Sequence, residues 1–278
     1  MKTRRRGLPD GWYPTSEKET RNTLQRWSET EETGGTGVAC VIPHAGWYFS
    51  GQLAFRTLAR LRRDVDTVVV VGGHLPAQNC LLVAPEEGYE TPLGILAADL
   101  ELKKALESCL ELIADYDRDN TVEVQLPMVA FLFPEAKVLW LRAPQSSLAA
   151  EAGRLLRKVT LELGKKTVVL GSTDLTHYGP SYGYSPRGTG KTALSWVKEE
   201  NDRGIIEAFL GMKEKEVLKR GIEQRASCSP GAAVTALAYA ASCGISRGTL
   251  VGYANSADIH PSDSFVGYAG VVYEEGHS

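Results

Sequence analysis

Residues 67–74 read Thr-Val-Val-Val-Val-Gly-Gly-His. Four consecutive valines ended by two glycines are typical of a short strand that is buried on both faces, as in the centre of a parallel sheet. Similar apolar runs end near Pro43 and Ser172, and residues 51–61 between them carry apolar residues at helical spacing. Strands that alternate with helices predict an α/β fold, a three-layer sandwich with a mostly parallel central sheet.

Polarity along the chain predicts its domain organisation. Residues 1–36 are polar, and we expect them to form a solvated lead-in. Residues 37–278 show no shift in composition, which predicts a single α/β domain. Within that domain, the run of helical segments between residues 193 and 243 predicts an insertion or a cap.

Composition excludes several functional classes. The 278 residues carry a formal net charge of −3, which argues against a nucleic-acid binder that works by bulk charge. No apolar run approaches the roughly 18 residues that span a bilayer, and no apolar segment follows the basic N-terminus as in a secretory signal. The five cysteines form no C-x-x-C pair, which suits a reducing compartment, so we expect a cytoplasmic protein without a membrane partner.

Three of the five histidines lie just beyond predicted parallel strands. These residues are His44, His74 and His177. In an α/β sheet the carboxyl ends of parallel strands meet at one edge, where ligands bind, so we expect the three side chains to share a site. The remaining histidines, His260 and His277, lie in polar segments and are predicted to be surface residues.

Converging imidazoles indicate metal ligation, acid–base chemistry or both. Two histidines and one anion leave open coordination positions, as in non-heme Fe(II) oxygenases. From the residues alone, the anion could be Asp174, Glu123 or a thiolate. Asp174 and His177 stand three residues apart. Asp174 could orient His177 as a base, or the two could be separate site residues. Alternatively, Asp174 caps a helix and His177 is a surface residue.

Cys228 is the candidate thiolate. It stands in the segment ASCSP, residues 226–230, immediately before a helix predicted to begin at Pro230. A helix N-terminus lowers the pKa of a thiol and favours the thiolate. The alternative interpretation, a small buried hydrophobic residue, is favoured for the other cysteines, which lie in apolar segments: Cys40, Cys80, Cys109 and Cys243.

Four motifs resemble those of the Memo family. Residues 43–51, PHAGWYFSG, resemble its P-H-A-G-Y-x-Y-S-G signature, and residues 122–127, VEVQLP, resemble its I-E-V-Q-L-P. Residues 172–179, STDLTHYG, are similar to its S-S-D-x-x-H-[YW]-G, and residues 253–256, YANS, to its Y-A-x-S. The motifs follow the family order, so the resemblance covers nearly the whole chain.

The resemblance implies an α/β fold related to the class III extradiol, LigB-type, non-heme iron dioxygenases. It also implies a metal site formed by His44, His74 and Cys228, with Fe(II) as the first candidate and Cu or Zn as alternatives. In the dioxygenase relatives a further histidine acts as an acid–base group, a position that His177 matches. Asp174 and His177 are then expected to position or exchange protons as catalytic residues, with Glu123 in support.

The family context also implies partners. Prokaryotic members are often called AmmeMemoRadiSam system protein B, which implies work alongside a radical-SAM enzyme and an AMMECR-like protein. The chain departs from the family pattern in the loop at residues 72–74, which is one residue shorter, and in residues 228–230, where proline follows the cysteine sooner. At residues 119–120, Asp-Asn replaces the usual Glu-His, so one imidazole is missing.

Three functions are compatible with these features. The first is a mononuclear non-heme iron enzyme of the redox or dioxygenase type. The second is a catalytically silent binding or adaptor protein whose cleft holds a peptide or a small ligand, an alternative that the missing imidazole motivates. The third is a metal-dependent hydrolase that activates a zinc-bound water.

Overall fold

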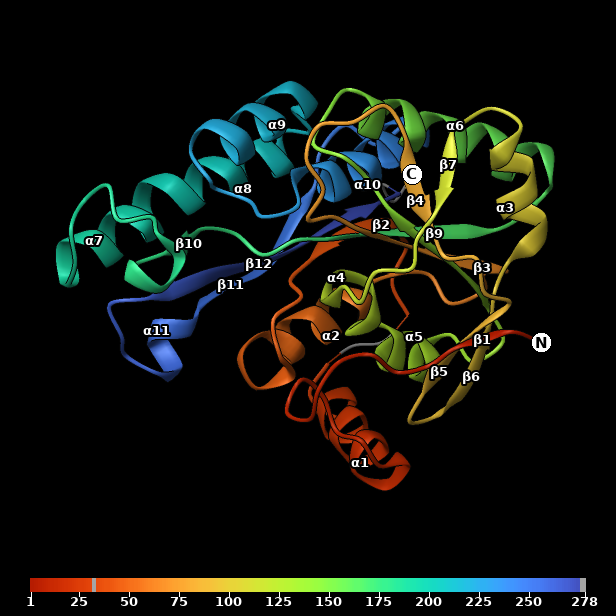
Figure 1. Ribbon diagram of the computed structural model, residues 1–278, viewed down its shortest axis with the longest axis horizontal. Coiled ribbons are helices and arrows are strands. Elements are labelled where there is room, and N and C mark those ends of the chain that lie inside the picture. Colours follow the sequence, from red (N-terminus) through yellow and green to blue (C-terminus); the bar gives the residue numbers. More distant parts are fainter. Residues whose placement is uncertain (32–33, 276–278) are drawn as a thin grey trace.

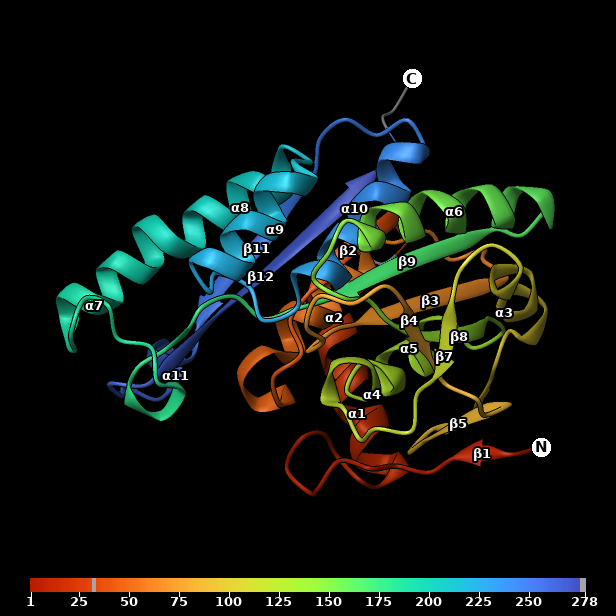
Figure 2. The same cartoon turned by 45° about the horizontal axis from the view of Figure 1, so that its top comes forward.

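The computed structural model describes residues 1–31 and 34–275. In this part of the chain the elements form three layers, which Figure 1 and Figure 2 show from two directions. A large sheet lies between a layer of helices and a second layer that combines helices with a small sheet. The predicted three-layer α/β architecture is therefore confirmed.

The centre of the large sheet is parallel. Four strands lie side by side there: β2 (Gly37–Ile42), β9 (Thr167–Ser172), β3 (Thr67–Gly72) and β8 (Lys137–Arg142). Every residue of β2, β3 and β9 is buried, as the valine-rich pattern predicts. The flanking strands are β4 (Leu81–Val83), β7 (Leu112–Ala114), β10 (His177–Tyr178), β11 (Thr249–Asn255) and β12 (Phe265–Glu274).

Two long helices, α6 (Leu148–Glu162) and α10 (Pro230–Ser242), cover one face of the sheet. Small residues allow them to approach closely: a Cβ atom on Gly153 would lie 2.3 Å from the carbonyl oxygen of Thr235. Shorter elements complete this layer and extend it beyond β12: α3 (Leu100–Glu107), α7 (Lys191–Trp196), η3 (Val197–Asn201), α8 (Asp202–Leu210) and α9 (Glu214–Glu223). Among the described residues, no helix combines the length and the apolar character that crossing a membrane requires.

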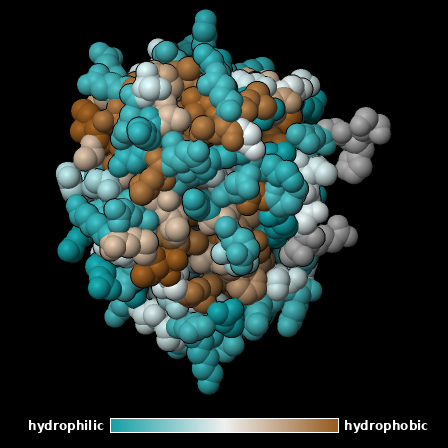
Figure 3. Space-filling model, turned by 90° about the vertical axis from the view of Figure 1, so that its right-hand side faces the viewer, coloured by the Kyte–Doolittle hydropathy of each residue, from teal (hydrophilic) through white to brown (hydrophobic). Residues whose placement is uncertain are grey.

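The other face carries a layer that includes a small sheet. Its helices are α1 (Glu17–Ser28), η1 (Trp47–Gly51), α2 (Gln52–Ala59), α4 (Asn120–Glu123) and α5 (Leu126–Leu132). The small sheet pairs β1 (Thr3–Arg4), β5 (Gly88–Thr91) and β6 (Gly94–Ala97). Figure 3 shows the side of the molecule that carries this sheet, where apolar and polar residues are interspersed.

The N-terminal segment differs from expectation. Residues 1–36 include β1 and α1, and they contribute to the core, because Leu24 of α1 is fully buried and Tyr13 is 3% exposed. The expectation of a solvated segment is therefore wrong at these positions, since their side chains pack into the core cluster of this layer. That residues 37–278 form a single domain stays a prediction.

Candidate metal centre

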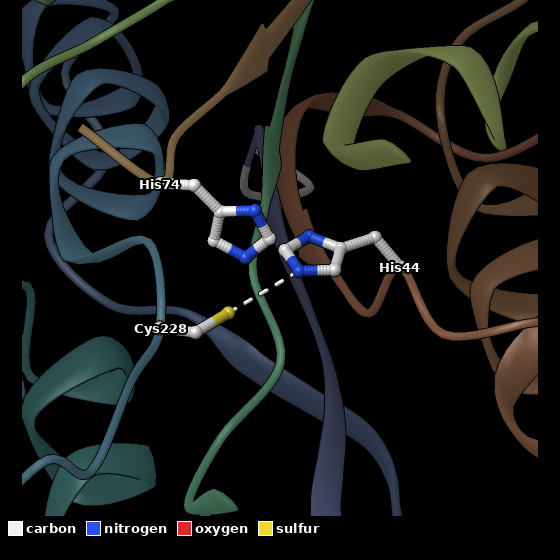
Figure 4. Close-up of side chains that lie close together, drawn as sticks. All are labelled: His44, His74 and Cys228. Carbon is white, nitrogen blue, oxygen red and sulfur yellow. Dashed lines mark hydrogen bonds between the residues drawn. The ribbon is translucent and has the colours of Figure 1, made fainter. Parts of the chain in front are cut away.

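Three side chains from distant parts of the chain converge at one edge of the large sheet. His44 follows β2, His74 follows β3, and Cys228 lies on the loop that leads into α10. Their donor atoms all lie within 4.8 Å of one another, and the Cys228 Sγ atom is 3.2 Å from His44 Nε2. Figure 4 shows each imidazole turning a ring nitrogen toward the sulfur. We call His44, His74 and Cys228 the ligand cluster.

The double glycine before His74 allows the end of β3 to approach the Cys228 loop. A Cβ atom on Gly73 would lie 2.3 Å from the Cβ atom of Ser229, so only glycine fits there. His74 itself has a φ of +56°, in the left-handed region that is unusual for residues other than glycine. Its backbone N–H donates to Ser229 Oγ at 3.2 Å, which helps to hold this conformation.

His44 is oriented by hydrogen bonds on three sides. Its backbone N–H donates to Asp174 Oδ1 at 2.7 Å, and its carbonyl oxygen accepts from Asn120 Nδ2 at 3.0 Å. Its Nδ1 atom hydrogen-bonds Ser172 Oγ at 3.2 Å. The residue is 1% exposed, and the Nδ1 contact leaves Nε2 directed at the sulfur of Cys228.

The environment of Cys228 favours the thiolate. Burial alone would raise its pKa, but the positive imidazoles of His44, His177 and His74 outweigh burial and hold the pKa well below its ordinary value. The backbone N–H of Asp174 also donates to the sulfur at 3.3 Å. A thiolate is the form of cysteine that ligates metals.

The pKa values of the imidazoles are shifted in the opposite direction, upward. Burial lowers the pKa of His74, but hydrogen bonds to Asp119 and Cys228 outweigh burial and raise it to about 10. His177 also has a pKa of about 10, because Asp174 and Cys228 outweigh the effect of its burial. Metal binding at this cluster therefore requires proton release, as for any site whose histidines must become neutral.

His177 and Asp174 lie beside the ligand cluster. The His177 Nε2 atom is 3.7 Å from Asp174 Oδ2, an ion-pair distance that is too long for a direct hydrogen bond. That nitrogen is buried and has no hydrogen-bond partner among the described residues. The ring of Tyr182, on η2 (Pro180–Tyr182), packs 5.0 Å from the His177 ring. The pair therefore lies next to the ligand cluster with one ring nitrogen unpartnered among the described residues.

Glu123 is not brought to the ligand cluster. Its carboxylate accepts hydrogen bonds from the backbone N–H groups of Gly7 and Leu8 and from the Tyr13 hydroxyl, each at 2.9 Å. Glu123 thus fastens the N-terminal segment to α4. The sequence gives no signal for this contact, because its partners lie more than a hundred positions away.

A cleft of about 680 Å³ opens beside the ligand cluster. His260 is exposed and lines this cleft, as a predicted surface residue, whereas His277 lies outside the described residues. Five of the nineteen described lining residues are aromatic, four more are histidines, and none is lysine or arginine. The aromatic residues are Trp12, Tyr48, Phe49, Tyr182 and Tyr268. The cleft can hold a small molecule directly against His44, His74 and His177.

Sequence reasoning left three supporting residues without a role. They are Asp119, Ser172 and Ser229, which contact the ligand cluster or its backbone. Asp119 and Ser229 stand in two of the segments in which this sequence departs from the Memo-family pattern. These departures could have drawn attention to both residues. Ser172 is the last residue of β9 and could have been identified from that position.

Comparisons with known proteins agree with the motifs. Residues 4–272 match the model of a family described as Memo-like protein. A "MEMO1 family protein" from Thermococcus onnurineus is 30% identical over 275 residues, covering 93% of this chain and 92% of its own length. Another from Methanosarcina mazei is 30% identical over 285 residues, covering 99% of this chain and its full length.

A solved structure shares the fold. The crystal structure of an uncharacterized protein from Escherichia coli K12 superposes with a TM-score of 0.50 at 14% sequence identity. The superposition covers 84% of this chain and 98% of the other. At this identity the likeness supports the fold alone.

Proposed function

Because this chain belongs to the Memo-like protein family, we propose that it binds one transition-metal ion through the ligand cluster and performs redox chemistry on a small molecule in the cleft. The observation that carries the proposal is the convergence of two imidazole nitrogens and one sulfur within 4.8 Å beside an open cleft. The residues present fit a metal, because the second ring nitrogen of each histidine already has a partner and the thiol is held ionised.

We propose Fe(II) as the metal, with Cu or Zn as alternatives. Three protein ligands that leave the remaining positions open are typical of non-heme Fe(II) oxygenases. A thiolate is softer than the usual carboxylate and also suits Cu(I) or Zn. The ion would supply a redox-active centre at which a substrate of the dioxygenase type is held.

In this proposal His177 and Asp174 handle protons. His177 lines the cleft, and its Nε2 atom has no hydrogen-bond partner among the described residues, so the ring would need to turn toward the cleft to exchange a proton with a bound molecule. Asp174 stabilises the charged imidazole that results. Glu123 acts indirectly, because it fastens the segment that brings Trp12 to the cleft wall.

Metal analysis of protein purified without oxygen tests the proposal. We expect stoichiometric transition metal in the native chain and its loss in Cys228→Ser, because serine at neutral pH does not replace a thiolate ligand. Cys109→Ser is the matched control, since Cys109 is exposed and distant in the sequence from the cluster. Native protein that takes up no metal, or a Cys228→Ser variant that keeps it, would contradict the proposal.

Oxygen uptake with a panel of catechols then tests the dioxygenase chemistry. The expected result is uptake by the iron-loaded native chain and none by His177→Ala, which should retain its metal. Uptake that does not depend on the catechol would argue against substrate oxidation in the cleft.

An adaptor role is the second candidate, and Asn120 favours it. Its amide lines the cleft and donates to the His44 carbonyl oxygen, at the position where the family usually has histidine. A metal-loaded chain that binds a peptide or a small ligand but consumes no oxygen with any catechol would support this role. The radical-SAM and AMMECR-like partners, and a cytoplasmic location, stay predictions, and co-purification of tagged proteins from the native host tests the partners.

A further inference from the structure

A single arginine contacts both supports of His74. Arg142 ends β8, and its side chain is 4% exposed. Its Nε atom donates to the carbonyl oxygen of Gly73 at 3.0 Å, and its Nη2 atom lies 3.6 Å from Asp119 Oδ2. We infer that Arg142 is the positioning residue that sets both the backbone and the ring of His74 for metal binding. This inference rests on the proposed metal site.

The backbone part of the argument concerns one peptide group. The Gly73 carbonyl and the His74 N–H belong to the same peptide unit, and each has its own partner. Arg142 holds the oxygen, and Ser229 Oγ accepts from the N–H at 3.2 Å. With both ends held, the plane of this peptide cannot rotate, which maintains the left-handed conformation that His74 adopts.

The ring part of the argument concerns the Asp119 carboxylate. Asp119 Oδ2 lies 3.1 Å from His74 Nδ1, while Oδ1 accepts from the backbone N–H of Thr121 at 2.9 Å. The carboxylate therefore occupies Nδ1 and directs the other ring nitrogen of His74 toward Cys228. Histidines that bind metals commonly donate their second N–H to a carboxylate in this way, and loss of that partner weakens metal binding.

The shape of the guanidinium makes this double contact possible. While Nε and Nη2 serve Gly73 and Asp119, Nη1 contacts Asp115 Oδ1 at 3.3 Å and Asp117 Oδ2 at 3.0 Å. Arginine presents its donors in a rigid planar fork, whereas lysine carries a compact charge on a flexible stem. Arg142→Lys therefore keeps the buried positive charge and removes the geometry that this inference requires.

The first measurement uses metal-free protein labelled with ¹⁵N at histidine. We expect the native chain to show a slowly exchanging Nδ1–H of His74, protected by Asp119, and Arg142→Lys to lose that protection. Arg63→Lys is the matched control. Arg63 precedes β3, at the end of the strand away from His74, is partly buried, and donates to the Leu132 carbonyl at 3.1 Å.

The second measurement uses Co(II) as the probe in competition with a chelator. We expect Arg142→Lys to bind Co(II) about 10- to 100-fold more weakly than the native chain, the usual effect of removing the support of a ligating histidine. The sulfur-to-cobalt absorption should persist because Cys228 is intact, while the ligand-field bands change. Arg63→Lys should match the native chain in both affinity and spectrum.

The outcomes separate this inference from the proposed function. An Arg142→Lys variant with native His74 protection and native cobalt affinity would overturn the role of Arg142. If the native chain binds no cobalt, the metal proposal fails, while the exchange measurement still decides whether Arg142 positions His74. If Arg142→Lys does not fold, Arg142→Gln replaces it in both measurements: lost His74 protection and weaker cobalt binding support the inference, and native values in both overturn it.

Discussion

Two acidic side chains near histidines of the site differ in their exposure and in their partners. Asp119, which is partly buried, contacts His74 and is paired with the buried guanidinium of Arg142. Asp202, the fully buried first residue of α8, accepts from Thr176, the residue before His177, through its backbone N–H at 3.1 Å and its hydroxyl at 2.5 Å. Within the described residues, no lysine or arginine lies at ion-pair distance from Asp202.

The pKa values of the two carboxylates are consequently shifted in opposite directions. Burial raises the pKa of Asp119, but hydrogen bonds from His74 and Thr121 and the charge of Arg142 outweigh it and lower the pKa to about 2. Burial dominates at Asp202 and raises its pKa to about 6. Asp119, beside His74, thus stays charged at all physiological pH values, whereas Asp202 changes its charge near pH 6.

The largest expected effect on stability comes from removing the guanidinium of Arg142. Arg142→Met keeps most of the side-chain volume and leaves the buried Asp115 and the partly buried Asp119 without their cation. Removing one partner of a buried ion pair typically costs about 3–5 kcal/mol, so we expect the free energy of unfolding to fall by that amount. Urea denaturation measures it, and a loss no greater than that of Arg63→Met would show that the arginine contributes no special stability.

A smaller, pH-dependent effect on the free energy of unfolding is expected from replacing Asp202. The folded-state pKa of Asp202 is raised, so its contribution to stability is fully present below its ordinary pKa and is lost as the pH rises through about 6. An asparagine side chain at this position would mimic the protonated acid at every pH. We therefore expect Asp202→Asn to gain about 3 kcal/mol of unfolding free energy relative to the native chain between about pH 4 and about pH 7.

Urea denaturation of both proteins across this pH range checks the Asp202 prediction. Asp119→Asn provides the contrast, because its native carboxyl has a lowered pKa and should show no gain as the pH rises. A difference between the native chain and Asp202→Asn that does not vary with pH would remove the distinction between the two carboxylates.

The smallest effect concerns the hydroxyl that supports Asp202. Tyr253 donates to Asp202 Oδ2 at 2.8 Å, and Tyr253→Phe removes this donor without changing the ring. A hydrogen bond to a charged group contributes about 1.5–3 kcal/mol, so we expect a loss of about 2 kcal/mol above pH 6 and a smaller loss below it. Equal losses at both pH values would indicate that Asp202 does not change its protonation state in this range.

Local patterns predicted the central strands and the residues that follow them. The valines of β3 and the positions of His44, His74 and Cys228 could be read from the sequence because strand ends and helix starts have local signals. The small sheet could not be predicted, since strands of two to four residues show no usable periodicity. Cys109, expected to be buried, is exposed just beyond the end of α3.

Long-range pairing limited the prediction of the site. Glu123 stands in a motif and carries a charge, two properties that also fit a catalytic residue, but its partners are groups far away in the chain. Arg142 ends an apolar strand, and nothing in its neighbourhood indicates that it contacts Asp119 and Gly73. Spacing identifies which element carries a residue, whereas its contacts depend on how the elements pack.

The wide separation of the cluster residues has a consequence for biosynthesis. His44 and Cys228 are 184 positions apart. The N-terminal segment is held through Gly7 by Glu123, which lies 116 positions later in the chain. Because chains emerge from the ribosome N-terminus first, neither the cleft wall nor the complete set of donors can exist on a nascent chain that is half made. A metal ion held by all three residues, as we propose, could therefore be bound only after Cys228 has emerged, late in synthesis.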